Sequence, residues 1–152
     1  MPNSCEECDA ARSPAPASTL IRVPIEYTTS LEGVAAEHLA GFFAGWPKPP
    51  SPGRHLEILR GSYRVVLARK QGSPDILGFV TAISDGVLTA FVPLLEVLPE
   101  HRGRGIGTEL VRRLFAELEP LYAVDLMCDP ELRPFYERLG MQRSVGMAIR
   151  RP

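Results

Sequence analysis

Apolar and β-branched residues dominate three consecutive segments in the middle of the chain, residues 63–70, 76–84 and 88–98. The stretches between them, QGSPD and SDG, have the composition of short turns that join neighbouring strands. Segments of this length and composition, separated by such turns, are typical of hairpins. The middle of the chain is therefore predicted to form an antiparallel meander of three strands.

The segments on either side of the meander mix helical and strand patterns. Before it, residues 21–28 predict a strand with an edge-type proline, and apolar residues at helical spacing predict a helix over 31–45. WPKPPSPG at 46–53 is a helix-breaking connection, and residues 55–60 allow a short helix. After the meander we expect a helix over 106–118, a strand over 123–128, a short helix to residue 139 and a last strand to about residue 150.

The connection from the third strand of the meander through the 106–118 helix to the next strand predicts a parallel crossover. Few residues remain after Gly140, so only one strand is expected at the end of the chain. A partner subunit in a homodimer is one way to complete the sheet.

The composition of the chain limits its domain organisation and the kinds of partner it can bind. With 152 residues and 45% hydrophobic content, the chain suits one domain. We expect a disordered tail over residues 1–19 and a single domain over 20–152. The 17 basic and 18 acidic residues give a net charge of −1, which disfavours nucleic acid or an anionic membrane as a partner.

The residues at the start of the chain lack the apolar centre of a signal peptide, and no apolar run approaches the roughly 20 residues of a membrane span. A cytoplasmic protein is therefore expected. Cys5 and Cys8 form a single CxxC pair without suitably spaced further ligands, so no metal site is predicted.

Residues 94–108, LLEVLPEHRGRGIGT, carry the clearest chemical signal. A strand enters a charged turn with glycines at 103, 105 and 107, and an amphipathic helix follows. Glycines let backbone N–H groups approach an anion, and the start of the helix directs unsatisfied amides and a positive dipole end toward it. Arg102 and Arg104 add full charges. This layout predicts a site for a pyrophosphate.

Two other nucleotide-binding motifs fail on spacing. A dinucleotide-binding fingerprint requires a third glycine where Thr108 stands, and a P-loop requires lysine and then serine or threonine after its last glycine. A nucleotide-binding domain of a redox enzyme is disfavoured for this reason.

The remaining pattern, RGRGIG, resembles the acetyl-CoA loop of the GNAT superfamily of N-acetyltransferases, and DPELRPFYERLGM at 129–141 resembles the later motif of that family. The resemblance covers roughly residues 63–150. It implies an α/β (α+β) single-domain fold with a central mixed, mostly antiparallel, twisted sheet and about four flanking helices. It also implies an acyltransferase that moves acetyl from acetyl-CoA to a primary amine.

By this resemblance, Tyr136 stands where the proton donor to the CoA sulfur lies, and a backbone N–H near Val97 or Leu98 polarises the thioester where the strand bulges. Asp129 departs from the family pattern, in which many members have an asparagine that binds CoA. The residues expected to contact the cofactor are Val97, Leu98, Arg102, Gly103, Arg104, Gly105, Ile106, Gly107, Thr108 and Asp129.

Glu96 is the leading candidate for the general base. It alternates with Val92, Leu94 and Leu98, so it places a carboxylate in an apolar row beside the expected thioester. A solvated glutamate at the strand edge, with water acting as the base, is the alternative. Cys128 is expected to be a packing residue, which favours direct attack in a ternary complex over an acetyl-cysteine intermediate.

The acceptor site is expected between the 31–45 helix, the connecting residues 46–55 and the third meander strand. Trp46, Arg54, His55 and Asp85 are its candidate specificity residues, and His38 is expected to be a partly buried, hydrogen-bonded histidine. The acceptor can be a small-molecule amine or a peptide amine, and the sequence does not choose between them. The alternative function is a non-catalytic acyl-CoA-binding sensor or interaction module on the same fold.

Overall fold

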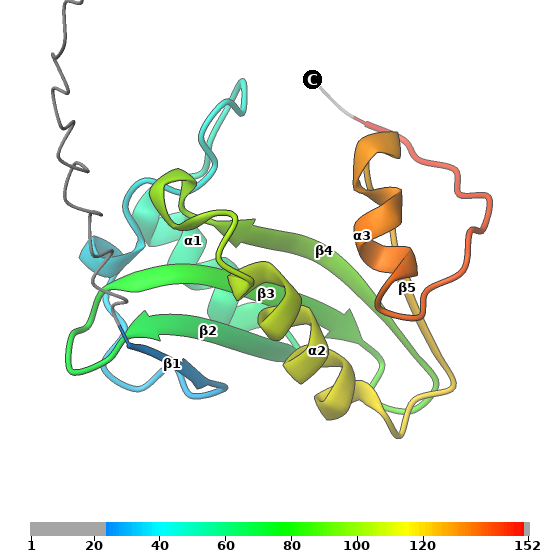
Figure 1. The fold of residues 1–152 in the computed structure, drawn as a ribbon, viewed down its shortest axis with the longest axis horizontal. Coiled ribbons are helices and arrows are strands. Elements are labelled where there is room, and N and C mark those ends of the chain that lie inside the picture. Colours follow the sequence, from blue (N-terminus) through cyan, green and yellow to red (C-terminus); the bar gives the residue numbers. More distant parts are fainter. Residues whose placement is uncertain (1–23, 151–152) are drawn as a thin grey trace, which may run out of the picture.

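The computed structural model describes residues 24–150. The predicted tail over 1–19, with Cys5 and Cys8, lies outside the described residues. The described part contains five strands, three α-helices and three short 3₁₀ helices (Figure 1). The strands are β1 (Ile25–Thr28), β2 (Arg64–Lys70), β3 (Ile76–Ser84), β4 (Thr89–Val97) and β5 (Ala123–Leu126); the helices are η1 (Ala36–Leu39), α1 (Pro52–Gly61), η2 (Pro99–His101), α2 (Ile106–Leu118), η3 (Pro130–Leu132) and α3 (Arg133–Glu137).

The five strands form one mixed sheet in the order β1-β2-β3-β4-β5. The first four pair antiparallel, which confirms the predicted meander, and β5 pairs parallel to β4. Parallel pairing requires a crossover, and α2 provides it. The fold class is therefore the predicted one, with three α-helices where about four were expected.

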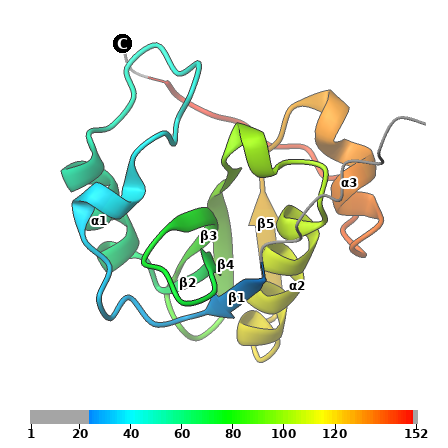
Figure 2. The same cartoon turned by 60° about the vertical axis from the view of Figure 1, so that its left-hand side comes forward.

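The helices α2 and α1 lie on opposite sides of the sheet (Figure 2), and a hydrophobic core lies on each face. On one face α2 packs its buried stripe against β2, β3 and β4. On the other face α1 and the 31–43 segment cover β2 and β3 through aromatic side chains. The helix α2 is held firmly by this burial, and its first turn is consequently fixed at the end of β4.

The helix α1 begins three residues before the predicted start at residue 55. Ser51 caps it, because its hydroxyl accepts a hydrogen bond from the Arg54 N–H at 3.3 Å, and Pro52 occupies the first helical position. Proline suits this position because its missing N–H would have no helical partner there. The PSPG segment therefore starts the helix as well as ending the connection.

The predicted helix over 31–45 is wrong. Only Ala36–Leu39 forms a helical turn, of the 3₁₀ type. Gly41, Phe43 and Gly45 all have positive φ, with Phe43 at 60°, and a right-handed helix cannot contain such residues. The apolar side chains still reach the core, so the spacing identified the buried positions but not the backbone.

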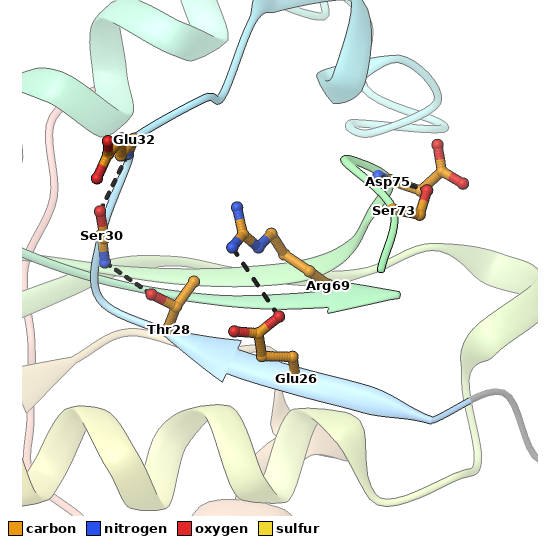
Figure 3. Close-up of polar contacts among 7 residues, drawn as sticks. All are labelled: Glu26, Thr28, Ser30, Glu32, Arg69, Ser73 and Asp75. Atoms are coloured by element: carbon orange, nitrogen blue, oxygen red, sulfur yellow. Dashed lines mark hydrogen bonds and ion pairs between the residues drawn. The ribbon is translucent and has the colours of Figure 1, made fainter. Parts of the chain in front are cut away.

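The chain leaves β1 through short polar turns (Figure 3). The Thr28 hydroxyl accepts the Ser30 N–H at 3.0 Å, and the Ser30 hydroxyl accepts the Glu32 N–H at 3.1 Å. Such side chains compete with regular secondary structure for the backbone, which helps to explain why a helix does not start here. Across the β1–β2 pair, Arg69 and Glu26 form an ion pair at 4.0 Å.

The end of the chain also departs from expectation. β5 stops at Leu126, two residues short of the predicted end, and α3 spans only five residues after the turn η3. Residues 141–150 contain no strand, so the predicted final strand is wrong for this chain in isolation. Among the residues that the structure describes, no helix is both long and apolar enough to cross a bilayer.

Candidate functional site

The turn between β4 and α2 has the conformation that an anion-binding loop requires. Gly103 and Gly105 have φ values of 72° and 80°, in the left-handed region that only glycine enters without strain. A Cβ atom added at either position would meet no atom within 4 Å, so the backbone there faces open space. Gly105 is the N-cap of α2.

The first intrahelical hydrogen bond of α2 joins the Glu109 N–H to the Gly105 carbonyl, at 3.1 Å. The N–H groups of residues 105–108 precede this bond and have no partner within the helix. Together they form a set of donors at the positive end of the helix dipole, next to the exposed turn. A diphosphate is the kind of ligand that such donors bind.

The two arginines of the loop make contacts within it. The Arg102 Nε donates to the Val97 carbonyl at 3.0 Å, and the Arg104 Nη1 lies 3.0 Å from the His101 Nδ1. Both guanidinium groups are exposed. Their positive charge therefore lies on the solvent-exposed side of the loop. The Arg102 hydrogen bond also joins the turn to the end of β4.

The end of β4 separates from β5. The last β4–β5 pair is Val92 with Leu126, so the later residues of β4 have no strand on that side. The Leu98 N–H donates to the Leu77 carbonyl at 2.9 Å, toward β3. Because N–H groups alternate in direction along an antiparallel strand, the N–H groups of Val97 and Leu95 point toward the side that β5 has left.

The structure places the β4 bulge earlier than the expected position near Val97. Thr81 pairs with Leu94 and Ile83 with Phe91, so Val92 and Pro93 together face one residue of β3. The bulge reverses the faces of the strand: Val92 lies in the core under α2, whereas Leu94 packs against the opposite core. Val92 consequently does not share a face with Glu96, as the simple alternation had predicted.

Glu96 is half-buried, and its carboxylate is hydrogen-bonded to the backbone of the 41–45 segment. Its Oε2 accepts the Phe43 N–H at 2.7 Å, which is short and charge-assisted. Among the residues that the structure describes, Phe43 is the one non-glycine residue with a positive φ. This conformation costs about 1–3 kcal/mol. The carboxylate therefore stabilises an unfavourable backbone conformation, a role that sequence analysis did not detect.

The helix α3 approaches the first turn of α2. A Cβ on Gly107 would lie 3.8 Å from the Val97 Cγ2 and 3.9 Å from the Phe135 Cζ, so β4, α2 and α3 meet at this glycine. Tyr136 follows Phe135, with the two rings 4.8 Å apart in an edge arrangement. The end of β4, the loop, the start of α2 and the helix α3 thus lie at one corner of the molecule (Figure 2).

Tyr136 is half-buried, and burial raises the pKa of its hydroxyl; the neighbouring Cys128 adds a smaller contribution in the same direction. The phenol is consequently protonated at neutral pH. Asp129 is exposed and is the N-cap residue of η3, but its side chain makes no capping hydrogen bond. Its backbone carbonyl accepts the Leu132 N–H at 2.9 Å.

His55 lies in the aromatic core and is only 1% exposed. Its ring contacts those of Phe42, Phe43 and Phe79, with the nearest centroid 4.4 Å away. Neither ring nitrogen has a well-formed hydrogen bond to the described residues. Burial lowers the pKa of His55 to about 4, and the nearby Leu39 backbone opposes this shift only in part. The ring is therefore neutral at neutral pH.

The buried His55 predicts a loss of stability in acid. Between the unfolded value of 6.5 and the folded value of about 4, the unfolded chain binds a proton that the folded chain does not. Stability therefore falls as the pH drops through this window, by about 2 kcal/mol between about pH 8 and about pH 5. Urea unfolding of wild type and His55→Phe measures it; the variant should lose most of this dependence.

His101→Asn is the matched control for that experiment, because His101 lies in the η2 turn outside the aromatic core. It should keep the wild-type dependence on pH. An unchanged slope in His55→Phe would show that His55 does not cause the acid sensitivity.

The other candidate specificity residues lie apart from this corner. Asp85 is in the β3–β4 turn at the opposite end of β4, where the N–H groups of Leu88 and Val87 hold the pKa of its carboxyl below the usual range. Arg54 is exposed and pairs with Glu57 at 3.0 Å. Trp46 is half-exposed and packs edge-on against Phe43, the residue whose N–H donates to Glu96.

His38 is partly buried, and its Nδ1 accepts the Ala35 N–H at 3.1 Å, as expected.

A hollow of about 360 Å³ lies beside Leu98 and His101, on the side of η1 rather than between β4 and β5. Residues 24–150 contain no group of three or more His, Cys, Asp or Glu side chains that could hold a metal ion.

Solved structures of two bacterial proteins are similar to this chain. A putative acetyltransferase from Deinococcus radiodurans R1 is similar in structure, with a TM-score of 0.80 and 50% identity over 84% of this chain and 88% of that chain. A GNAT-family acetyltransferase from Streptococcus pneumoniae TIGR4 shares the fold, with a TM-score of 0.67 and 22% identity over 85% of this chain and all of that one.

Among curated sequences, the uncharacterized N-acetyltransferase ycf52 of Pyropia yezoensis is 24% identical over 99 residues, covering 63% of this chain and 57% of the relative. A probable glucosamine 6-phosphate N-acetyltransferase 2 of Oryza sativa is 47% identical over 51 residues, covering 32% and 31%. The chain thus spans little more than half of the length of the first and a third of the second. The model of the acetyltransferase (GNAT) family matches residues 31–141, and the chain belongs to this family.

Proposed function

We propose that the protein is an acetyl-CoA-dependent N-acetyltransferase that transfers acetyl to a primary amine by direct attack in a ternary complex. One observation carries the proposal. The free amides at the start of α2, the unpaired end of β4 and the Tyr136 helix meet around Gly107. This is the arrangement that acetyl transfer needs: an anion site, a donor for a carbonyl and an acid for a thiolate.

The loop fits the diphosphate of coenzyme A. Its glycines leave the backbone open, and the N–H groups of residues 103–108 are available as donors, with Arg102 and Arg104 beside them. Bound there, acetyl-CoA supplies the activated acetyl thioester. Gly107 lets the first turn of α2 lie close to Val97 and Phe135. The rest of the cofactor is assigned to the β5 side of β4, where the two strands have separated.

The end of β4 supplies a donor to the thioester carbonyl. The Val97 N–H points into the space that β5 has left, whereas the Leu98 N–H is bound to Leu77. We therefore assign carbonyl polarisation to the Val97 side of the strand, with Leu95 one step earlier on the same side. A fixed donor at this position stabilises the negative charge that develops on the oxygen during attack.

Glu96 is the proposed base. One carboxylate oxygen accepts the Phe43 N–H, and the second is available to take a proton from the acceptor ammonium, directly or through water. The neutral amine then forms the C–N bond while the C–S bond breaks. The hydrogen bond from the Phe43 N–H restricts the rotation of the Glu96 carboxylate, so the second oxygen keeps one orientation.

Tyr136 is the proposed acid. The departing sulfur takes the phenolic proton, which burial keeps in place at neutral pH until transfer. The nitrogen gives up its surplus proton as the amide forms, and this proton, passed through water, restores the phenol. Phe135 of the short helix α3 lies next to Gly107 in the first turn of α2, beside the loop that is proposed to hold the cofactor.

A thiol-release assay with acetyl-CoA and a panel of amines tests the function. The panel should contain glucosamine 6-phosphate, to which the name of the rice relative points, together with a polyamine, an aminoglycoside, free amino acids, a peptide N-terminus and a lysine peptide. We expect amine-dependent release of CoA with at least one class. Binding of acetyl-CoA with no release in any arm would favour the non-catalytic sensor.

Replacing Glu96 with glutamine should separate its two roles. The glutamine oxygen can still accept the Phe43 N–H, so the melting temperature should change little. Activity should fall, and most at low pH, where the acceptor amine is hardest to deprotonate. The measurement is kcat/KM against pH, with Glu100→Gln on the exposed turn as the control. A wild-type profile in Glu96→Gln would leave Glu96 with a structural role only.

A further inference from the structure

His55 packs against two residues that are both direct neighbours of Glu96. Glu96 accepts the Phe43 N–H at 2.7 Å, and in the sheet it pairs with Phe79 of β3. The centroid of the His55 ring lies 4.9 Å from that of Phe43 and 4.4 Å from that of Phe79. One buried ring on α1 therefore contacts both the residue that donates to Glu96 and the residue that lies opposite Glu96 on the next strand.

The backbone of Phe43 needs support to keep its contact with Glu96. Its φ of 60° is a conformation that a non-glycine residue keeps only where the surrounding contacts outweigh the strain. Phe43 is 2% exposed, and its carbonyl accepts the Trp46 N–H at 3.1 Å, which closes the turn. The packing of the Phe43 ring in the core is therefore one of the contacts that keep its N–H directed at the carboxylate.

His55 contributes through the packing of its ring. Neither ring nitrogen has a hydrogen-bond partner among the described residues, and burial lowers the pKa of the ring to about 4, so it is uncharged at neutral pH. The ring meets those of Phe42 and Phe43 nearly at right angles, at 79° and 77°. Edge-to-face pairs have a preferred geometry, so they restrain the orientation of the two rings as well as filling space.

We propose that His55 is a positioning residue for Glu96. Its ring holds Phe43 in the left-handed conformation, and the Phe43 N–H holds one carboxylate oxygen, so that the other keeps one orientation toward the acceptor. These contacts join α1, the 41–45 segment and β4. The inference rests on the proposed function for the role of Glu96 as the base, but the contacts from His55 to Glu96 do not depend on that role.

Nuclear magnetic resonance measures the contact directly and without any need for activity. A hydrogen bond as short as 2.7 Å should give a scalar coupling between the Phe43 amide nitrogen and the Glu96 side-chain carboxyl carbon. We expect this coupling in the wild type and its loss in His55→Ala. His55→Leu fills most of the space without a ring and should lose the coupling too, so the test does not depend on the folding of the alanine variant. His55→Phe keeps a ring and should keep the coupling.

The kinetic effect should be confined to the chemical step. In the thiol-release assay we expect His55→Leu to lower kcat by about tenfold or more, because a misplaced base abstracts the proton less effectively. The KM for acetyl-CoA should not change, and His55→Phe should restore the wild-type kcat at neutral pH. A loss of stability alone would lower the melting temperature without separating kcat from KM in this way.

Leu59→Ala is the matched control. Leu59 is 1% exposed, lies on the same helix and belongs to the same core as Phe43 and Phe79. Its truncation should lower the melting temperature at least as much as His55→Leu does, because it leaves a cavity. It should keep both the coupling and the wild-type kcat.

The two measurements separate this inference from the proposed function. A coupling that persists in both His55→Ala and His55→Leu would overturn the inference, as would an equal fall of kcat in Leu59→Ala or a lost coupling with unchanged turnover. If the wild type transfers acetyl to no amine, the proposed function fails, and the coupling alone then decides whether His55 holds Glu96 in place.

Discussion

Replacing Gly105 with glutamate will abolish the rise in melting temperature that acetyl-CoA produces in the wild-type protein. Gly105 precedes the first turn of α2 in a left-handed conformation, beside the amides proposed to hold the diphosphate. A carboxylate there repels the phosphates at close range, and we expect a loss of affinity on the order of 100-fold or more. Thermal unfolding with and without acetyl-CoA measures the shift.

Gly72→Glu is the matched control. Gly72 has a φ of 73° and open space around its Cβ position, but it lies in the β2–β3 turn. Its substitution introduces the same backbone strain and the same charge away from the loop. The control should lower the melting temperature without acetyl-CoA as much as Gly105→Glu does, and should keep the ligand-induced shift. If both variants kept the shift, the loop assignment would be wrong.

Removing the Tyr136 hydroxyl will lower turnover by about 100-fold or more while leaving the affinity for acetyl-CoA nearly unchanged. General acids typically contribute 10²–10⁴-fold, and the hydroxyl is proposed to act only when the C–S bond breaks. Tyr136→Phe keeps the ring that packs against Phe135. The measurements are kcat in the thiol-release assay and the binding constant of acetyl-CoA.

Tyr122→Phe serves as the control, because this tyrosine is 87% exposed at the start of β5, away from α3. It should be fully active. A fully active Tyr136→Phe would remove the tyrosine from the mechanism, and a parallel loss of acetyl-CoA binding would indicate a role in holding the cofactor instead.

Features encoded in local sequence were predicted well. The three meander strands follow from continuous apolar runs and short turns, and α2 follows from a buried stripe that begins directly after the glycines. The loop conformation could be anticipated because Gly103 and Gly105 are themselves the residues that adopt positive φ.

Features that depend on distant contacts were not predicted. The 31–45 segment has helical spacing, but its backbone turns at Phe43, whose N–H is held by a carboxylate 53 residues away. The GFFAG sequence, with glycines on both sides of two phenylalanines, is the local signal that could have indicated this turn. The β4 bulge is similarly invisible in the sequence apart from Pro93, since it depends on the register with β3.

A crystal structure of the protein with acetyl-CoA tests the proposed cofactor site most sharply. We expect the diphosphate to lie within hydrogen-bond distance of the N–H groups of residues 103–108, with the pantetheine running along β4 beside Val97. A diphosphate bound elsewhere, with the loop amides contacting only water, would contradict it.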